Sequence, residues 1–246
     1  MNIKLLSSCV AALALSVVVS PSFAAPVGTA PVAQPGPAPM PKAKLLSSIT
    51  AKNVAGVPGE KKNFEATLIE KVSNKPIAGK RVVFTLTGKD GTNVPGGTMQ
   101  IGVDTTDASG KATVSFAVPE LVQGNYMIKV SYPGDDATFG SSDQANLLVV
   151  KAITAIDLGN LIWGTYKNEP GSPYGTIIFS LRRTVDGKAI ERPLQITVNG
   201  QSWTLSPQIV HSIALPQNAT TWNVKVTWAG DGVYQPFEVT KVFHKP

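Results

Sequence analysis

The two histidines of the sequence, His211 and His244, are the candidate bases for activating a serine or threonine nucleophile. His211 shares a predicted strand face with Ile209 and Ile213, which favours a partly buried position in that strand. His244 lies two residues from the C-terminus, and no nucleophile-elbow sequence accompanies either histidine. We therefore predict no catalytic residues and a protein that is not an enzyme.

Aspartates that follow predicted strands are the candidate metal ligands, because Ca²⁺ prefers oxygen donors. The candidates are Asp135, Asp136 and Asp231. An aspartate directly after a strand can instead accept hydrogen bonds from the amides of its own turn, and neither turn has an alternating Asp-x-Asp pattern. Turn closure is the favoured interpretation, with calcium binding as the alternative, and we predict no metal and no other cofactor.

Tryptophan side chains are the candidate ligand-binding groups, because an aromatic ring on a flat face can stack against a sugar ring. All four tryptophans lie in the second half of the chain. Trp222 and Trp228 alternate with valines on one predicted strand face, so we interpret both as structural. For Trp163 and Trp203, packing in the core or at a domain junction is the first interpretation. The speculative binding site consists of Trp163, Trp203, Tyr166 and Tyr174.

The stretch that carries two of these tryptophans occurs twice in the sequence. Residues 126–139 read YMIKVSYPGDDATF and residues 222–234 read WNVKVTWAGDGVY, with Asp135 and Asp231 aligned at an offset of 96 residues. In both copies apolar and mostly polar residues alternate, which indicates a strand with one buried and one exposed face. The repeat therefore predicts two units of roughly 100 residues each.

Short strands separated by turn signals continue through both units, and this pattern predicts an all-β fold of two tandem immunoglobulin-like sandwiches. The Asn199-Gly200 pair predicts a two-residue hairpin turn, since both of its central positions require positive φ. In the first unit strands are expected near residues 47–53, 62–72, 81–86, 97–103, 111–118, 125–132 and 144–151. In the second unit they are expected near residues 152–158, 174–184, 194–198, 202–205, 208–214, 222–228 and 237–244.

The N-terminal residues have the order of a Sec-type signal peptide: Lys4, an apolar run, Pro21 and small residues before a cleavage site expected after Ala24. The single cysteine, Cys9, lies inside this segment, so the mature chain is expected to have neither a thiol nor a disulfide. No later run approaches the roughly 20 apolar residues of a membrane-spanning helix. We predict a secreted or periplasmic protein without an integral membrane segment.

The predicted domain organisation follows from this leader and the repeat. Residues 1–24 are the signal peptide, and residues 25–43 are a disordered Pro/Ala-rich leader, whose composition favours extended polyproline conformations. Residues 44–151 are the first immunoglobulin-like sandwich, and residues 152–246 are the second and more divergent one.

The formal net charge of +6 at pH 7 does not by itself indicate nucleic-acid binding. Residues 44–151 contain 12 basic and 10 acidic side chains, and residues 152–246 contain 8 and 6. A nucleic-acid-binding protein concentrates its basic residues in a patch or along one element. The only adjacent arginines, Arg182 and Arg183, precede a predicted turn and are expected to be solvated. We predict no nucleic-acid partner.

Three segments resemble bacterial immunoglobulin-like (Big-type) repeat domains. They are Pro76 to Lys80 before Val82-Val83-Phe84, Thr105 to Ala112 with its Asp-x-x-Gly-Lys-Ala order, and Tyr132-Pro133-Gly134-Asp135 running on to Phe139. The resemblance covers most of the first unit, whereas the second unit keeps only the segment from Thr227 to Asp231. It implies a module for spacing, adhesion or display, and it specifies no ligand.

From these observations we predict a secreted, non-enzymatic protein in cell-surface adhesion or extracellular matrix association, with a surface protein or polysaccharide as partner. One alternative is a carbohydrate-binding module that uses the aromatic residues of the second unit. A further alternative is a periplasmic assembly chaperone, for which Val114, Phe116 and Val118 alternate suitably, although no Arg–Lys pair can be placed in a cleft. The sequence indicates no oligomeric state.

Overall fold

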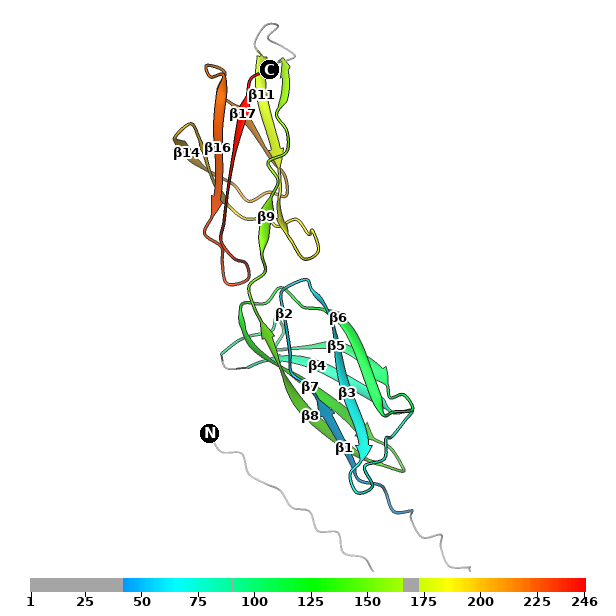
Figure 1. The fold of residues 1–246 in the computed structure, drawn as a ribbon. Coiled ribbons are helices and arrows are strands. Elements are labelled where there is room, and N and C mark those ends of the chain that lie inside the picture. Colours follow the sequence, from blue (N-terminus) through cyan, green and yellow to red (C-terminus); the bar gives the residue numbers. More distant parts are fainter. Residues whose placement is uncertain (1–41, 90, 166–172) are drawn as a thin grey trace, which may run out of the picture. The chain divides into compact units, whose positions relative to one another are not determined.

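The computed structural model describes residues 42–89, 91–165 and 173–246. Throughout these ranges the regular structure is β-strand, without a helix (Figure 1), so the predicted all-β fold class is confirmed. None of the described segments forms a helix long and apolar enough to cross a membrane.

The first eight strands build two sheets that lie on either side of one hydrophobic cluster. The strands are β1 (Ser47–Ala51), β2 (Val54–Gly56), β3 (Lys61–Glu70), β4 (Arg81–Gly88), β5 (Thr98–Thr105), β6 (Lys111–Ala117), β7 (Gly124–Gly134) and β8 (Phe139–Val149). One sheet has the order β1-β3-β6, and the other has the order β2-β8-β7-β4-β5. The chain passes repeatedly from one sheet to the other, and the eight strands form an immunoglobulin-like β-sandwich.

The pairing of β2 with β8 differs from the other strand pairings described in this sandwich, because it is parallel. Val54 lies opposite Leu147, and Gly56 lies opposite Val149. The strand near the N-terminal end of the sandwich is thus bonded directly to its last strand. The remaining pairs, such as β3 with β6 and β7 with β8, are antiparallel.

Nine further strands lie in the described residues of the second half. They are β9 (Thr154–Ile156), β10 (Ile162–Thr165), β11 (Pro173–Phe179), β12 (Leu181–Arg183), β13 (Leu194–Val198), β14 (Gln201–Leu205), β15 (His211–Leu215), β16 (Thr221–Trp228) and β17 (Phe237–His244). The largest sheet has the order β14-β13-β16-β17, and β10-β11-β15 and β12-β9 complete the second layer.

The first segment of this half takes a different path from that of the first sandwich. β9 and β10 both pair antiparallel with the same stretch of chain, through β12 and β11. In the described residues β17 is bonded along its length to β16 alone, and the Lys241 ammonium of β17 donates a hydrogen bond to the carbonyl of Gly159. A side-chain bond therefore lies where the first sandwich has the β2–β8 ladder.

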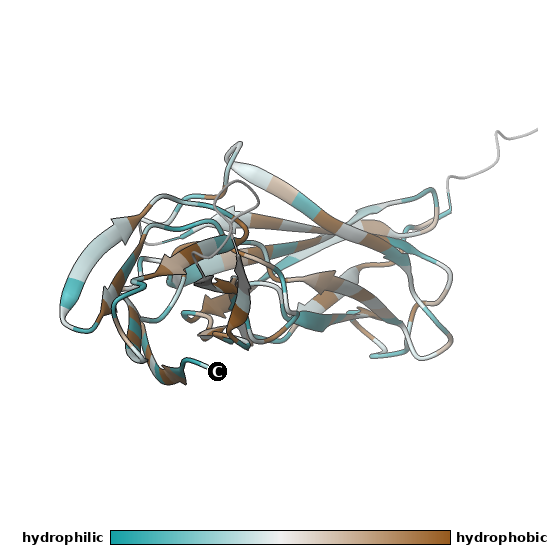
Figure 2. Ribbon diagram, turned by 90° about the horizontal axis from the view of Figure 1, so that it is seen from above, coloured by the Kyte–Doolittle hydropathy of each residue, from teal (hydrophilic) through white to brown (hydrophobic). Residues whose placement is uncertain are grey.

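Alternating hydrophobic and polar residues position the strands of both halves, as the hydropathy colours in Figure 2 show. One cluster of buried side chains extends from Ile49 to Val149, and a second extends from Ala152 to Phe243. In the first cluster the rings of Phe64 and Phe84 meet edge to face, with centroids 5.8 Å apart. The two clusters lie on either side of the predicted domain boundary after Lys151, which remains a prediction.

The two copies of the repeated strand, β7 and β16, make the same kind of hydrogen bond at corresponding residues. The Tyr126 hydroxyl donates to the carbonyl of Val122 at 2.8 Å, and the indole nitrogen of Trp222 donates to the carbonyl of Pro216 at 2.8 Å. A tyrosine at this corner of an immunoglobulin-like sandwich makes such a bond to the preceding loop. The structural role predicted for Trp222 agrees with its complete burial.

The predicted strands differ from the structure mainly at short elements. The stretch expected as one strand over residues 174–184 is divided into β11 and β12, and β2 and β10 were not expected. Trp163, which lies between the strands expected near residues 152–158 and 174–184, is part of β10. The strand expected from residue 208 begins only at His211, so Ile209 lies outside it and is exposed.

The Asn199-Gly200 hairpin is confirmed. Both residues have positive φ, 47° at Asn199 and 87° at Gly200. The Asn199 side chain adds two bonds, because its Oδ1 accepts from the amide of Asn223 at 2.8 Å and its Nδ2 donates to the carbonyl of Thr221 at 3.0 Å. This turn fixes the register of β13 against β14.

Candidate functional site

The structure places the aromatic residues of the speculative binding site in different parts of the second half. Trp163 of β10 is half-buried, with its ring centroid 6.0 Å from that of Trp222 and the Lys245 ammonium 5.4 Å above it. Trp203 of β14 is 37% exposed and lies opposite Ile196. Tyr174 lies in β11 opposite Gly164, and Tyr166 lies outside the described residues.

β10 and β14 belong to different sheets, so Trp163 and Trp203 do not share one sheet face. Trp163 is in contact with the core and with a lysine, whereas the exposed ring of Trp203 is accessible to a ligand. The two rings therefore do not form a single flat platform.

The two aligned aspartates close their turns in the same way. Oδ1 of Asp135 accepts from the amides of Ala137 and Thr138 at 2.9 and 2.8 Å, and Oδ2 accepts from the Lys80 ammonium at 2.5 Å. The ammonium is the main cause that lowers the pKa of the Asp135 carboxyl, and the turn amides lower it further. Asp136 is exposed beside this turn.

Asp231 repeats the arrangement with an arginine in place of the lysine. Its Oδ1 accepts from the amides of Val233 and Tyr234 at 2.7 and 2.9 Å, and its Oδ2 accepts from Nε of Arg192 at 2.9 Å. Partial burial acts to raise the pKa of the Asp231 carboxyl, but the bonds from Arg192 and the two amides outweigh it and lower the pKa.

These bonds occupy the carboxylate oxygens that a calcium ion would need. No group of three or more His, Cys, Asp or Glu side chains suitable for a metal occurs in the described part of the chain. The hydrogen bonds of Asp135 and Asp231 agree with turn closure, the favoured interpretation. Calcium binding by Asp135, Asp136 or Asp231 stays the alternative.

The two histidines lie in different environments. His211 is buried at the start of β15, and its ring stacks on Phe179 with centroids 5.3 Å apart. Its Nε2 has no hydrogen-bond partner in the described structure, and burial lowers the pKa of the imidazole. His244 is exposed, with Nδ1 3.4 Å from Oγ1 of Thr221. Burial of His211 agrees with the structural role predicted for it.

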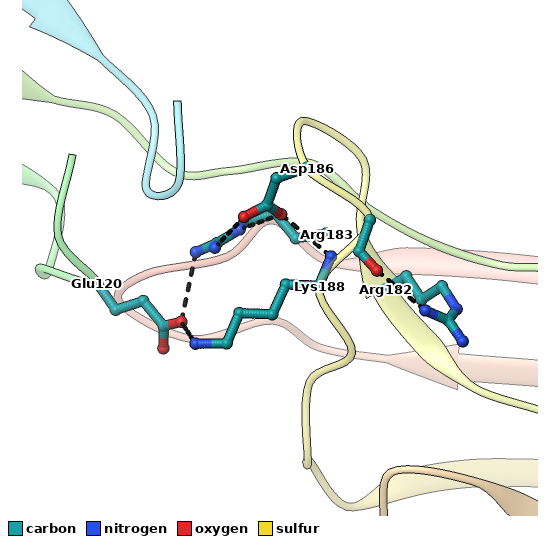
Figure 3. A network of polar contacts seen from close by, with 6 residues as sticks. Glu120, Arg182, Arg183, Asp186 and Lys188 are labelled. Atoms are coloured by element: carbon teal, nitrogen blue, oxygen red, sulfur yellow. Dashed lines mark hydrogen bonds and ion pairs between the residues drawn. The ribbon is translucent and has the colours of Figure 1, made fainter. Parts of the chain in front are cut away.

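Arg183 corrects the prediction that both adjacent arginines are solvated. Arg182 is exposed, but the Arg183 side chain is only 4% exposed. Figure 3 shows its guanidinium bound by both oxygens of Asp186, from Nε at 2.9 Å and from Nη2 at 2.5 Å. A Cβ atom at Gly59 would overlap this guanidinium. The arginine is buried because a distant glycine leaves room for it.

The same network includes Glu120, which lies just after β6. Its Oε1 accepts from the Lys188 ammonium at 2.6 Å and lies 3.4 Å from Nη1 of Arg183 (Figure 3). The Lys188 ammonium is the main cause that lowers the pKa of the Glu120 carboxyl, and Arg183 lowers the pKa of Asp186 to about 2. These charges bind one another, so they form a structural cluster.

A groove of about 780 Å³ at one end of the sheet β14-β13-β16-β17 is the strongest candidate for a ligand site. We call it the sheet-end groove. Its volume lies within the range of small-molecule and cofactor sites in proteins. It is lined by Pro193, Gln195, Thr204, Thr227, Trp228, Ala229, Pro236, Phe237 and Glu238.

Four polar residues of the groove form one row across all four strands. Gln195 lies opposite Thr204 on β14 and opposite Thr227 on β16, and Thr227 lies opposite Glu238 on β17. The row is on the outer face, since the neighbours of Gln195 along its strand are buried. The amide nitrogen of Gln195 donates to Oγ1 of Thr204 at 2.7 Å. Hydrogen-bonding groups therefore lie side by side at strand spacing.

The apolar part of the groove is made where β16 ends and β17 begins. The rings of Trp228 and Phe237 lie 6.2 Å apart and are tilted by 57°. Trp228 is 9% exposed, so it is largely a core residue, as predicted, and it also lines the groove. Amphipathic lining of this kind, apolar with a few placed polar groups, is typical of binding sites for organic ligands.

The sequence alone does not indicate this groove. Its residues come from four strands, and only the register brings Thr204, Gln195, Thr227 and Glu238 into one row. The outward-facing polar positions were visible in the sequence. Their alignment across strands depends on hairpin geometry and on long-range pairing.

No family model matches the chain, and no curated protein matches it. Solved structures with some similarity include the fibronectin(III)-like modules of Clostridium thermocellum CbhA, at 16% identity and a TM-score of 0.27 over 78% of this chain and 92% of that chain. The adhesin InvE of Yersinia pseudotuberculosis matches at 13% identity and 0.36, over 79% and 58%. The titin domains z1z2 in complex with telethonin match at 17% and 0.34, over 80% and 93%. Such similarity assigns neither a family nor a ligand to this chain.

Proposed function

We propose that this protein is exported and acts, without catalysis, in attachment to a cell surface or an extracellular matrix. The signal-peptide pattern of residues 1–24 and the Pro/Ala-rich leader support export. An all-β scaffold with a preformed groove supports a binding role.

The observation that carries the proposal is the sheet-end groove. Its polar residues lie on four hydrogen-bonded strands, so their backbone positions are fixed before any ligand arrives. A preorganised site loses less conformational entropy on binding. The charged side chains around Arg183 form ion pairs with one another, which agrees with a structural role for this cluster.

We also propose that the two halves, residues 44–151 and 152–246, are two modules of one kind. The matching bonds of Tyr126 and Trp222 support this, as do the matching ion pairs Lys80–Asp135 and Arg192–Asp231. In each pair the basic residue precedes a strand of the large sheet, and the aspartate follows the repeated strand. One module architecture used twice accounts for both sets of contacts.

Binding of the mature chain, residues 25–246, to whole bacterial cells and to extracellular matrix preparations tests the proposal. We expect saturable retention that survives physiological salt, because the charge of the protein is not concentrated in one patch. No retention on any of these materials would contradict attachment. Turnover of any of the matrix polymers by the purified chain would contradict the non-enzymatic part.

A further inference from the structure

We propose that the sheet-end groove binds a neutral polysaccharide, whose chain lies across the strands along the row Thr204, Gln195, Thr227 and Glu238. This inference rests on the proposed attachment function and names the ligand class of its site. It also places carbohydrate recognition away from Trp163, which does not line the groove.

The row carries the hydrogen-bonding groups that sugar hydroxyls require. The Thr204 and Thr227 hydroxyls donate and accept, the Gln195 amide does both, and the Glu238 carboxylate accepts. A sugar hydroxyl also donates and accepts, so it can bond to any of these four. In the ligand-free groove Gln195 and Thr204 bond to each other at 2.7 Å, which keeps both side chains on the ligand face.

The row also has the dimensions of a short stretch of a polysaccharide. Neighbouring strands lie about 4.8 Å apart, so four strands span about 14 Å. Hydroxyls repeat along an extended sugar chain at a similar interval, and a chain crossing the strands therefore meets one polar side chain per strand. The lining at the apolar end, with Trp228 and Phe237, offers carbon surface for the C–H faces of a sugar ring.

The charges of the groove favour a neutral ligand. Among the described residues that line the groove, Glu238 alone is charged, and the Lys225 ammonium lies 2.7 Å from its carboxylate. The carboxylate of Glu238 repels an anionic polymer, and the ammonium of Lys225 beside it repels a cationic one. A neutral ligand bonds to the row without separating this ion pair.

The first sandwich offers an internal comparison. Ser131 lies 96 residues before Thr227, and the corresponding row consists of Val103, Val83, Ser131 and Ser142. The residues in the places of Thr204 and Gln195 are thus valines. The same scaffold thus occurs without two of the four polar groups, so β-sheet structure alone does not require them. This difference assigns the recognition chemistry to the second sandwich.

The test replaces two polar residues of the groove by the valines that occupy the corresponding positions of the first sandwich. The variant carries Gln195→Val and Thr204→Val, and the control carries Thr197→Val and Ser202→Ala. Thr197 and Ser202 lie in the next row on the same two strands and bond to each other at 2.6 Å, but they do not line the groove. Both variants lose one exposed hydrogen-bonded pair. Unchanged thermal unfolding confirms that each variant is folded.

The probes are soluble neutral polysaccharides, namely β-1,4-glucan, β-1,3-glucan, xylan and mannan, with polygalacturonate as the anionic comparison. Affinity electrophoresis and calorimetry on the mature chain measure binding. We expect at least one neutral polymer to bind, about a tenfold or greater loss in the groove variant, and little change in the control variant.

The other outcomes overturn this inference in distinguishable ways. Binding of a neutral polymer that the groove variant retains would place the sugar site elsewhere. Binding only to polygalacturonate, or only to cells and equally by both variants, would overturn the ligand assignment and leave attachment standing. If the chain is retained neither on cells nor on any polymer, both proposals fail.

Discussion

Burial of a single charged residue, Arg183, depends on groups far from it in the sequence. Its neighbours Arg182 and the turn at Val185 to Gly187 suggested a solvated surface. Gly59 leaves the space that the guanidinium fills, and Asp186 and Glu120 provide its counter-charges. A buried arginine is stable only with such partners, because desolvating its charge alone is costly. The local sequence shows only one of the three.

Replacing Arg183 by methionine is expected to lower the free energy of unfolding by about 2 kcal/mol, because Asp186 loses its counter-charge. The estimate is below that for a fully buried pair, since the Asp186 side chain is 33% exposed. Urea unfolding followed by circular dichroism measures the change. The exposed neighbour provides the control, since Arg182→Met is expected to change stability by less than about 0.5 kcal/mol. Equal effects of both substitutions would contradict the role of the Arg183 network.

His211 predicts a pH dependence of stability. Burial lowers the pKa of its imidazole in the folded state below the ordinary value near 6.5. The unfolded chain therefore binds more protons as the pH falls below about 6.5, and the free energy of unfolding decreases by up to about 1.4 kcal/mol per pH unit until the folded-state pKa is reached. Well above the ordinary value near 6.5 both states are neutral at this residue, and it contributes no pH dependence.

Urea unfolding at pH 7.5 and at pH 5.5 tests this prediction. We expect His211→Leu to remove most of the decrease in this interval, because the leucine does not titrate. His244 is exposed, so His244→Ala is expected to leave the decrease unchanged. A decrease that persists fully in His211→Leu would show that another group causes it.

At the scale of single elements, the Asn199-Gly200 turn determines how β13 and β14 pair. No atom lies within 4 Å of the position that a Cβ of Gly200 would take, so any cost of a side chain there arises from its positive φ. We expect Gly200→Ala to lower the free energy of unfolding by about 1–2 kcal/mol, and Gly200→Asn to cost less, because asparagine tolerates this conformation. Tryptophan fluorescence during urea unfolding measures both. Equal costs would mean that backbone strain is not the cause.

Most strands could be predicted from the sequence because their alternation is long enough to be unambiguous. β16 and β17 run over eight residues each and were predicted to within one residue. β2 and β10 have three and four residues, too few for a period of two to be visible. β15 begins at His211, and Ile209, which was expected on the same strand face as His211 and Ile213, lies outside the strand and is exposed.

The candidate site could not be predicted for a related reason. Hydropathy indicates which face of a strand points outward, but not which residue of the next strand lies opposite. Gln195 and Glu238 are 43 positions apart and meet in one row only through Thr227 of β16. An aromatic residue is a candidate binding group by its type alone, so the sequence indicates Trp163 and Trp203. It does not indicate that they lie in different sheets.

At the scale of the whole molecule, two separate hydrophobic clusters predict two unfolding transitions. All four tryptophans lie in the second half, so fluorescence reports on that half, whereas far-UV circular dichroism reports on both. We expect the two signals to follow different urea curves. Coincident curves fitted by one two-state transition would contradict independent modules. A variant that removes the ion pairs of Glu120 with Arg183 and Lys188 would then show whether these contacts couple the unfolding of the two halves.

The parallel pairing of β2 with β8 has a mechanical consequence for the proposed role in attachment. Tension applied through the two ends of the first sandwich pulls β2 and β8 in opposite directions along their lengths. Their hydrogen bonds are then sheared together and do not open one at a time. In the described residues of the second sandwich no such ladder joins the first strand, β9, to the last, β17. Under tension we therefore expect the second sandwich to unfold before the first.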